Sequence, residues 1–213
     1  MGLKEIIAGR QEESGLTLVE MAVVLIILSV VLTMTLRGLT AVSSTASGAD
    51  RRLQNLDEAR IVMNNLSKDL RTAVALTPGT PAFLVASANE TTFYANLNPV
   101  RGPVKVHLYI DTGKRLVREI MQPDNSSVAP NFTYTGASTT RILGTYVVNS
   151  TSSPIFTFYD ATGTVLTTPL SDSARLSVRS IDIVVIIQKP GGKAPASTLV
   201  TRVRLPNAYY NAA

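Results

Sequence analysis

The chain has 213 residues, enough for one domain of ordinary size together with one membrane-spanning segment. It contains no cysteine, which excludes disulfide bonds, thiolate metal sites and cysteine nucleophiles. It contains a single histidine, so this chain cannot by itself build a site from several histidines. The formal net charge is +5, a modest basic surplus that is scattered along the sequence.

An apolar segment of 21 residues runs from Leu16 to Leu36 and is followed by Arg37. A helix of that length covers about 31 Å, close to the apolar thickness of a bilayer. Glu20 is the only charged residue inside the segment. A charged side chain at the centre of a membrane helix costs roughly 2.5–3.5 kcal/mol on insertion scales, so such residues mark functions. We therefore expect Glu20 to have a cationic partner, supplied by another helix of the same kind.

Two common types of N-terminal segment fit this pattern less well. A cleaved secretory signal has an apolar region of about 7–15 residues followed by a small-residue cleavage site. Here the apolar region is longer, and Gly15 lies before it. An uncleaved signal anchor accounts for the length and leaves Glu20 unexplained. Lys and Arg residues flank the segment on both sides, so the positive-inside rule does not set its orientation.

The residues Gly15-Leu16-Thr17-Leu18-Val19-Glu20, followed by an apolar helix, resemble the class III signal of type IV prepilins and pseudopilins. The resemblance implies that a membrane peptidase cuts between Gly15 and Leu16 and then methylates the amino group of Leu16. It also implies that Glu20, the fifth residue after the cut, acts in filament assembly. Leucine at position 16 departs from the phenylalanine that is commoner in the family.

A second helical segment is expected to follow the apolar one. Residues 38–48 are rich in Gly, Ser and Thr and predict a bend or a locally weaker helix. Helical periodicity then returns, with Asp69 among the charged residues expected to fall off the apolar stripe. Pro78-Gly79 predicts the end of a helix that runs from about Thr17 to Leu76. The residues of the expected stripe are Leu53, Leu56, Ala59, Met63, Leu66, Leu70 and Val74.

The rest of the sequence predicts antiparallel strands joined by turns. Turns at 111–114 and 160–163 are expected to close two hairpins. Alternation places Ile181, Ile183 and Val185 on one strand face, together with Ile187. Strands are expected at residues 91–97, 104–110, 115–121, 154–159, 164–168, 176–188 and 198–205.

One long helix followed by antiparallel strands predicts an α+β fold. Its long N-terminal helix would have a transmembrane first half and an amphipathic second half packed on a C-terminal antiparallel β-sheet domain. The order of elements resembles the larger minor pilins and the J- and W-type pseudopilins. The expected segments are a leader (1–15), a transmembrane and filament-core helix (16–37), its amphipathic continuation (38–76) and a β-rich extracytoplasmic domain (77–213).

No catalytic constellation appears, and we expect no enzymatic activity, cofactor or metal site. His107 lies within a predicted strand, where a residue facing solvent or the core is the favoured interpretation. A nucleic-acid interface would need clustered basic residues, ideally with aromatics. Two groups of basic residues are candidates: Lys114, Arg115 and Arg118, and separately Arg202 and Arg204. For Arg202 and Arg204 a solvated strand face is the favoured interpretation, so nucleic acid is a possible but unsupported partner.

The family resemblance implies a minor pilin-like subunit that initiates or caps a type IV pilus. A pseudopilin of a type II secretion or DNA-uptake system is the alternative within the same class. A membrane-anchored binding domain that never polymerises is the alternative of another class. The implied partners are the prepilin peptidase and methyltransferase, other pilin or pseudopilin subunits, the inner-membrane assembly platform and membrane lipid. The implied location is a single-pass cytoplasmic membrane protein with an external C-terminal domain, found in a cell-surface filament after assembly.

Overall fold

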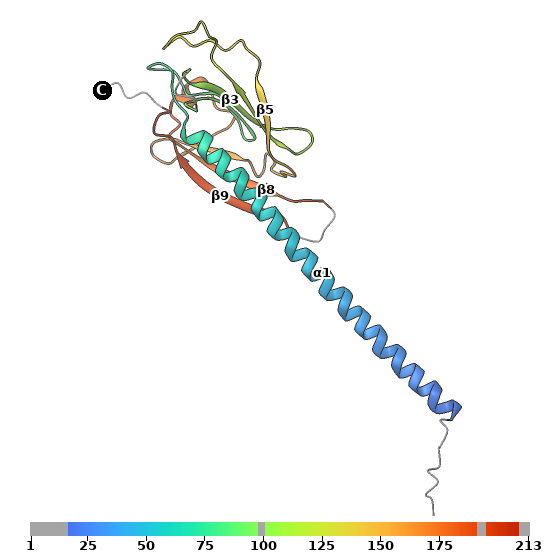
Figure 1. Ribbon diagram of the computed structural model, residues 1–213. Helices are drawn as coiled ribbons and strands as arrows, with labels where there is room; N and C mark the ends of the chain where they lie inside the picture. Colours follow the sequence, from blue (N-terminus) through green and yellow to red (C-terminus); the bar gives the residue numbers. More distant parts are fainter. Residues whose placement is uncertain (1–16, 98–100, 191–194, 209–213) are drawn as a thin grey trace, which may run out of the picture. The chain divides into compact units, whose positions relative to one another are not determined.

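The computed structural model describes residues 17–97, 101–190 and 195–208. Helix α1 (Leu18–Arg71) opens the described chain (Figure 1). By its internal contacts the chain divides into two units, residues 1–47 and 48–213, and α1 contributes to both. The second unit contains the last part of α1 and all of the strands.

The strands of the second unit form two antiparallel sheets. Five strands, in sequence order, form the first sheet: β1 (Phe83–Ala86), β2 (Glu90–Ala95), β3 (Val104–Ile110), β4 (Leu116–Met121) and β5 (Thr139–Gly144). Four strands in the order β7-β6-β8-β9 form the second sheet: β6 (Phe156–Tyr159), β7 (Val165–Leu166), β8 (Ser180–Ile187) and β9 (Ser197–Arg204). A short helix, α2 (Asp172–Leu176), precedes β8. The expected α+β architecture is confirmed, and it is consistent with a pilin fold.

Several elements differ from the sequence expectation. The predicted hairpins β3–β4 and β6–β7 are present, but β1 and β5 were not expected. Helix α2 ends at Leu176 with Ser177 as its C-cap, and β8 begins only at Ser180, four residues later than expected. Helix α1 ends at Arg71 rather than near Leu76, because the backbone beyond it bonds to β2 instead. The N–H of Val74 donates to the carbonyl of Tyr94 at 2.8 Å.

The core of the second unit lies where α1 meets both sheets (Figure 1). Within the expected stripe, Leu53 is wrongly assigned, because its side chain is 59% exposed. The four isoleucine and valine residues expected on one face of β8 are all buried, which confirms the alternation of that strand. From α1 the core takes Ala59, Val62, Met63, Leu66 and Leu70.

Asp69 is buried in the last turns of α1, contrary to the expectation that it would fall off the buried stripe. Its carboxylate accepts hydrogen bonds from Nη1 of Arg118 on β4, at 2.9 Å to Oδ2 and 3.2 Å to Oδ1. Burial raises the pKa of the Asp69 carboxyl, and the Arg118 guanidinium opposes that shift. Removing one member of such a pair leaves an uncompensated buried charge. The pair therefore fixes how this part of the helix meets the first sheet.

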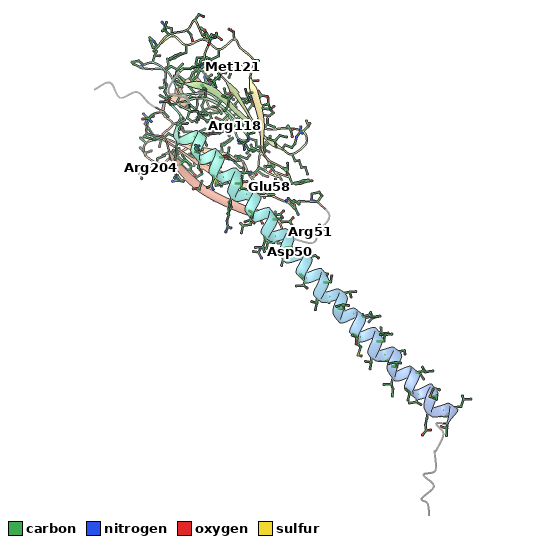
Figure 2. The ribbon with its side chains drawn as sticks, viewed as in Figure 1. Asp50, Arg51, Glu58, Arg118, Met121 and Arg204 are labelled. Carbon is green, nitrogen blue, oxygen red and sulfur yellow. The ribbon has the colours of Figure 1, made fainter. Side chains whose placement is uncertain are left out.

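The end of β5 approaches α1 closely, near Glu58 and Val62. A Cβ added to Gly144 would lie 2.3 Å from Cγ2 of Val62. The next residue, Thr145, donates its N–H and its hydroxyl to Oε1 of Glu58, at 2.7 and 2.5 Å. Lys189 contributes an ammonium 3.2 Å from Oε2 of the same carboxylate. Glu58 is labelled on α1 in Figure 2. Burial disfavours the charge, but the Thr145 hydrogen bonds and Lys189 outweigh it and lower the pKa of Glu58.

We predict that Gly144→Ala destabilises the second unit by about 1–3 kcal/mol, because the added methyl group overlaps the buried Val62 side chain. The matched control is Gly136→Ala, since a Cβ there would meet nothing within 4 Å. The control is expected to stay within about 0.5 kcal/mol of the native chain. The measurement is the free energy of unfolding by chemical denaturation in detergent micelles. Equal effects of the two substitutions would show that the close approach has no energetic weight.

Candidate assembly site at the start of helix α1

The expected processing residues come directly before the described residues in the sequence. Gly15 and Leu16, where cleavage and methylation are expected, fall outside the described residues, which begin at Thr17. Glu20 is described and lies in the first turn of the helix. The geometry of the expected site can therefore be examined from Thr17 onwards.

Thr17 and Glu20 form reciprocal hydrogen bonds at the start of α1. The N–H and the hydroxyl of Thr17 donate to Oε2 of Glu20 at 2.8 and 2.9 Å. In return, the N–H of Glu20 donates to Oγ1 of Thr17 at 3.3 Å. The carbonyl of Thr17 accepts from the N–H of Met21, which makes Thr17 the residue that caps the helix. This arrangement is a capping box, and it satisfies backbone donors that the first turn of a helix leaves free.

Sequence reasoning singled out Glu20 but missed the part played by Thr17. The available signal was a threonine followed three residues later by glutamate, directly before an apolar run. The capping box holds one oxygen of the Glu20 carboxylate in place. Within the described part of the chain, the other oxygen, Oε1, accepts no hydrogen bond. The carboxylate is therefore oriented by its own helix while keeping an acceptor for a further partner.

Among the residues that the structure describes, none covers the apolar surface around Glu20. Every described residue of the first unit, from 17 to 47, is exposed. By length and composition, α1 is long and apolar enough to cross a membrane. The hydroxyls of Ser29, Thr33 and Thr35 donate to backbone carbonyls of the preceding turn, at 2.7–2.8 Å. Such a surface suits lipid or other apolar helices, because its hydroxyl donors are already satisfied.

His107 lies on the face of β3 that points away from the core. Its Nε2 is 3.0 Å from a carboxylate oxygen of Glu90, and its Nδ1 is 3.6 Å from Glu119. The ring also stacks on Tyr109, with centroids 4.6 Å apart. These contacts join three neighbouring strands. Among the residues that the structure describes, no group of three or more His, Asp or Glu side chains is placed to hold a metal ion.

The structure tests whether each of the two candidate basic groups forms an exposed patch. In the first, Arg115 is paired with Asp111 at 2.6 Å, and Arg118 is committed to its pair with Asp69. These residues therefore form no common patch with Lys114. In the second, Arg202 and Arg204 are both exposed on β9, as the strand alternation predicts.

Residues 10–36 match the family model described as the prokaryotic N-terminal methylation motif. The chain carries a class III signal peptide of the type IV pilin kind. The motif contains both members of the capping box and most of the uncovered apolar surface. Comparison with curated proteins and with solved structures gave no significant match. The motif supports a substrate of prepilin peptidase that assembles with other pilins, and the apolar helix is consistent with anchoring in the membrane.

We predict that Thr17→Val weakens the first turn of α1 by about 1 kcal/mol, because it removes the capping hydroxyl. The measurement is amide hydrogen exchange of residues 18–21 in the chain held in detergent micelles. Thr33→Val is the matched control, since its hydroxyl bonds only to the Ser29 carbonyl within the helix. Unchanged protection of residues 18–21 in Thr17→Val would contradict a capping role.

Proposed function

We propose that the chain is a minor pilin-like subunit of a type IV pilus, which enters the filament and helps to initiate or cap it. Prepilin peptidase would cut between Gly15 and Leu16 and methylate the amino group of Leu16. The chain would act as a structural subunit without enzymatic activity. One observation carries the proposal: the methylation motif coincides with an uncovered apolar helix whose first turn holds an oriented carboxylate.

In this proposal, cleavage creates the cation that Glu20 lacks. Removal of residues 1–15 leaves an amino group on Leu16, and methylation of an amine retains its positive charge. A bare carboxylate or ammonium is costly in apolar surroundings, and pairing the two offsets much of that cost. Glu20 of one subunit would therefore attract the amino terminus of its neighbour. Because both groups have fixed positions on their helices, the pair would set the axial register between subunits.

The capping box contributes orientation to this pairing. The Glu20 carboxylate is already held at its Oε2 oxygen by Thr17, so less side-chain freedom is lost when the neighbour's amine binds. The uncovered apolar surfaces of neighbouring helices would then pack together by close van der Waals contact. The first units would form the filament core, and the second units would lie outside it.

A pseudopilin of a type II secretion or DNA-uptake system would use the same processing and the same pairing. The 198 residues left after removal of residues 1–15 exceed the length of the simplest major subunits, which favours a minor component. A membrane-anchored domain that never polymerises would leave Glu20 without a cation in the membrane. The partners in this proposal are the prepilin peptidase, other pilin subunits, the inner-membrane assembly platform and lipid.

We predict that Glu20→Gln abolishes incorporation into filaments while leaving membrane insertion intact. Glutamine serves in capping boxes as glutamate does, so this variant keeps the helix cap and removes only the charge. Asp57→Asn is the matched control, because it neutralises an exposed acid on α1 in the second unit. The measurement is the amount of the chain in the sheared filament fraction relative to the membrane fraction. We expect at least a tenfold fall for Glu20→Gln and no change for Asp57→Asn. Native incorporation of Glu20→Gln would rule out the pairing.

A further inference from the structure

Three arginines border a hollow of about 780 Å³ at one end of the second sheet. The turn Asp160–Gly163, between β6 and β7, forms one side of the hollow. Arg179 and Ser180 border it at the start of β8, and Arg202 and Arg204 border it at the end of β9. Arg204 is labelled in Figure 2. Strands β8 and β9 are antiparallel, which brings the start of one beside the end of the other. We call this region the arginine hollow.

The guanidinium of Arg202 lies over the ring of Tyr159. Its Nε and Nη2 donate to the two carboxylate oxygens of Asp182, at 2.5 and 2.7 Å. Its guanidinium carbon lies 4.1 Å from the centroid of the Tyr159 ring. The hydroxyl of Tyr159 donates to the same carboxylate at 2.8 Å, and these donors outweigh burial and lower the pKa of Asp182. The guanidinium is thus fixed in place with its side chain still half exposed.

Arg204 provides a charge that its surroundings do not neutralise. Among the described residues, the structure shows no hydrogen bond or ion pair of its guanidinium. The carboxylates of Asp182 and Asp160 are bound to other groups. Asp182 is matched to Arg202, and the Asp160 carboxylate accepts from the N–H and hydroxyl of Thr162 at 2.9 and 2.7 Å. Asp160 also accepts from the backbone N–H of Thr164 at 2.9 Å, so it is bound within its own turn.

We propose that the arginine hollow binds single-stranded nucleic acid. A guanidinium matches the geometry of a phosphate, so Arg204 would contact the backbone. Proteins that bind single strands combine such cationic grooves with flat side chains on which unpaired bases stack, and arginine planes serve as well as aromatic rings. The Arg202 guanidinium, supported from below by Tyr159, would provide that flat surface. A duplex has no free base faces for it, and an acidic polysaccharide has no base at all.

This site goes beyond the filament function and does not depend on it. The clustering comes from residues that lie far apart in the sequence. Arg202 and Arg204 are visible as an alternating pair on a strand, whereas Arg179 and Tyr159 join them only through the register of β6, β8 and β9. The structure therefore contains a cluster of basic residues beside an aromatic ring, which a nucleic-acid interface requires and which the sequence alone did not show.

The test measures fluorescence anisotropy of a labelled oligothymidine of about 12 nucleotides, within the usual site sizes for single strands. The protein is the full chain in non-ionic detergent. We expect a dissociation constant of about 10⁻⁴–10⁻⁶ M at physiological salt, the range of non-specific binding, and weaker binding as salt rises. Arg204→Ala should weaken binding several-fold and reduce the slope of log affinity against log salt by about 0.7, the value for one phosphate on a single strand.

Arg60→Ala is the matched control, because it removes one exposed arginine from α1 in the same unit. It should leave the affinity and the salt slope unchanged, and circular dichroism should show native folding of both variants. Three results would overturn the proposal. They are no binding of the native chain at low salt, equal losses for Arg60→Ala and Arg204→Ala, and displacement of the strand by heparin or a duplex at the same concentration as by unlabelled oligothymidine.

Discussion

The proposed assembly of this protein depends on one charged group in apolar surroundings. Glu20 lies on a helix surface that is exposed in the described part of the chain, and its carboxylate is oriented by Thr17. A charge in that position is costly until a cation joins it, and the sequence from Leu16 to Leu36 contains no basic residue. The methylation motif accounts for both facts, because processing of such a signal creates a new amino terminus next to the helix. In the proposed function, the same 21 residues serve both membrane anchoring and filament assembly.

The second unit shows how the same helix also serves as a core element of a folded domain. Polar residues of α1 hold it at defined points: Glu58 on Thr145 and Lys189, and Asp69 on Arg118. Between these points, apolar side chains of the helix pack against both sheets. A buried ion pair is weak evidence for stability, but it specifies one arrangement, since a shifted helix would leave both charges unpaired. The chain has no disulfide bond, so such contacts and the core maintain the fold.

The sequence predicted the elements whose signals are local. The alternation of β8, the turn at 111–114 and the apolar span were all visible in runs of a few residues. The burial of Asp69 was not, because its partner Arg118 lies 49 residues away in the sequence. Leu53 fits the helical period, but its position on α1 is not covered by the sheets. The strands β1 and β5 contain residues that favour strands, but they are short and lie at the two edges of the first sheet, where no clear alternation marks them.

The functional candidates also differ in how far the sequence alone predicts them. Glu20 is conspicuous because a charge interrupts an apolar run, and its Thr17 partner follows a local spacing rule. The arginine hollow could be predicted only in part, because its residues come together through the pairing of three strands.

The most direct measurement of the central account is mass spectrometry of the intact chain and of its N-terminal peptide, isolated from the native membrane. The account predicts a chain that begins at Leu16 with a methylated amino group. A chain that still begins at Met1 would contradict it, because Glu20 would then have no processed amino terminus to meet.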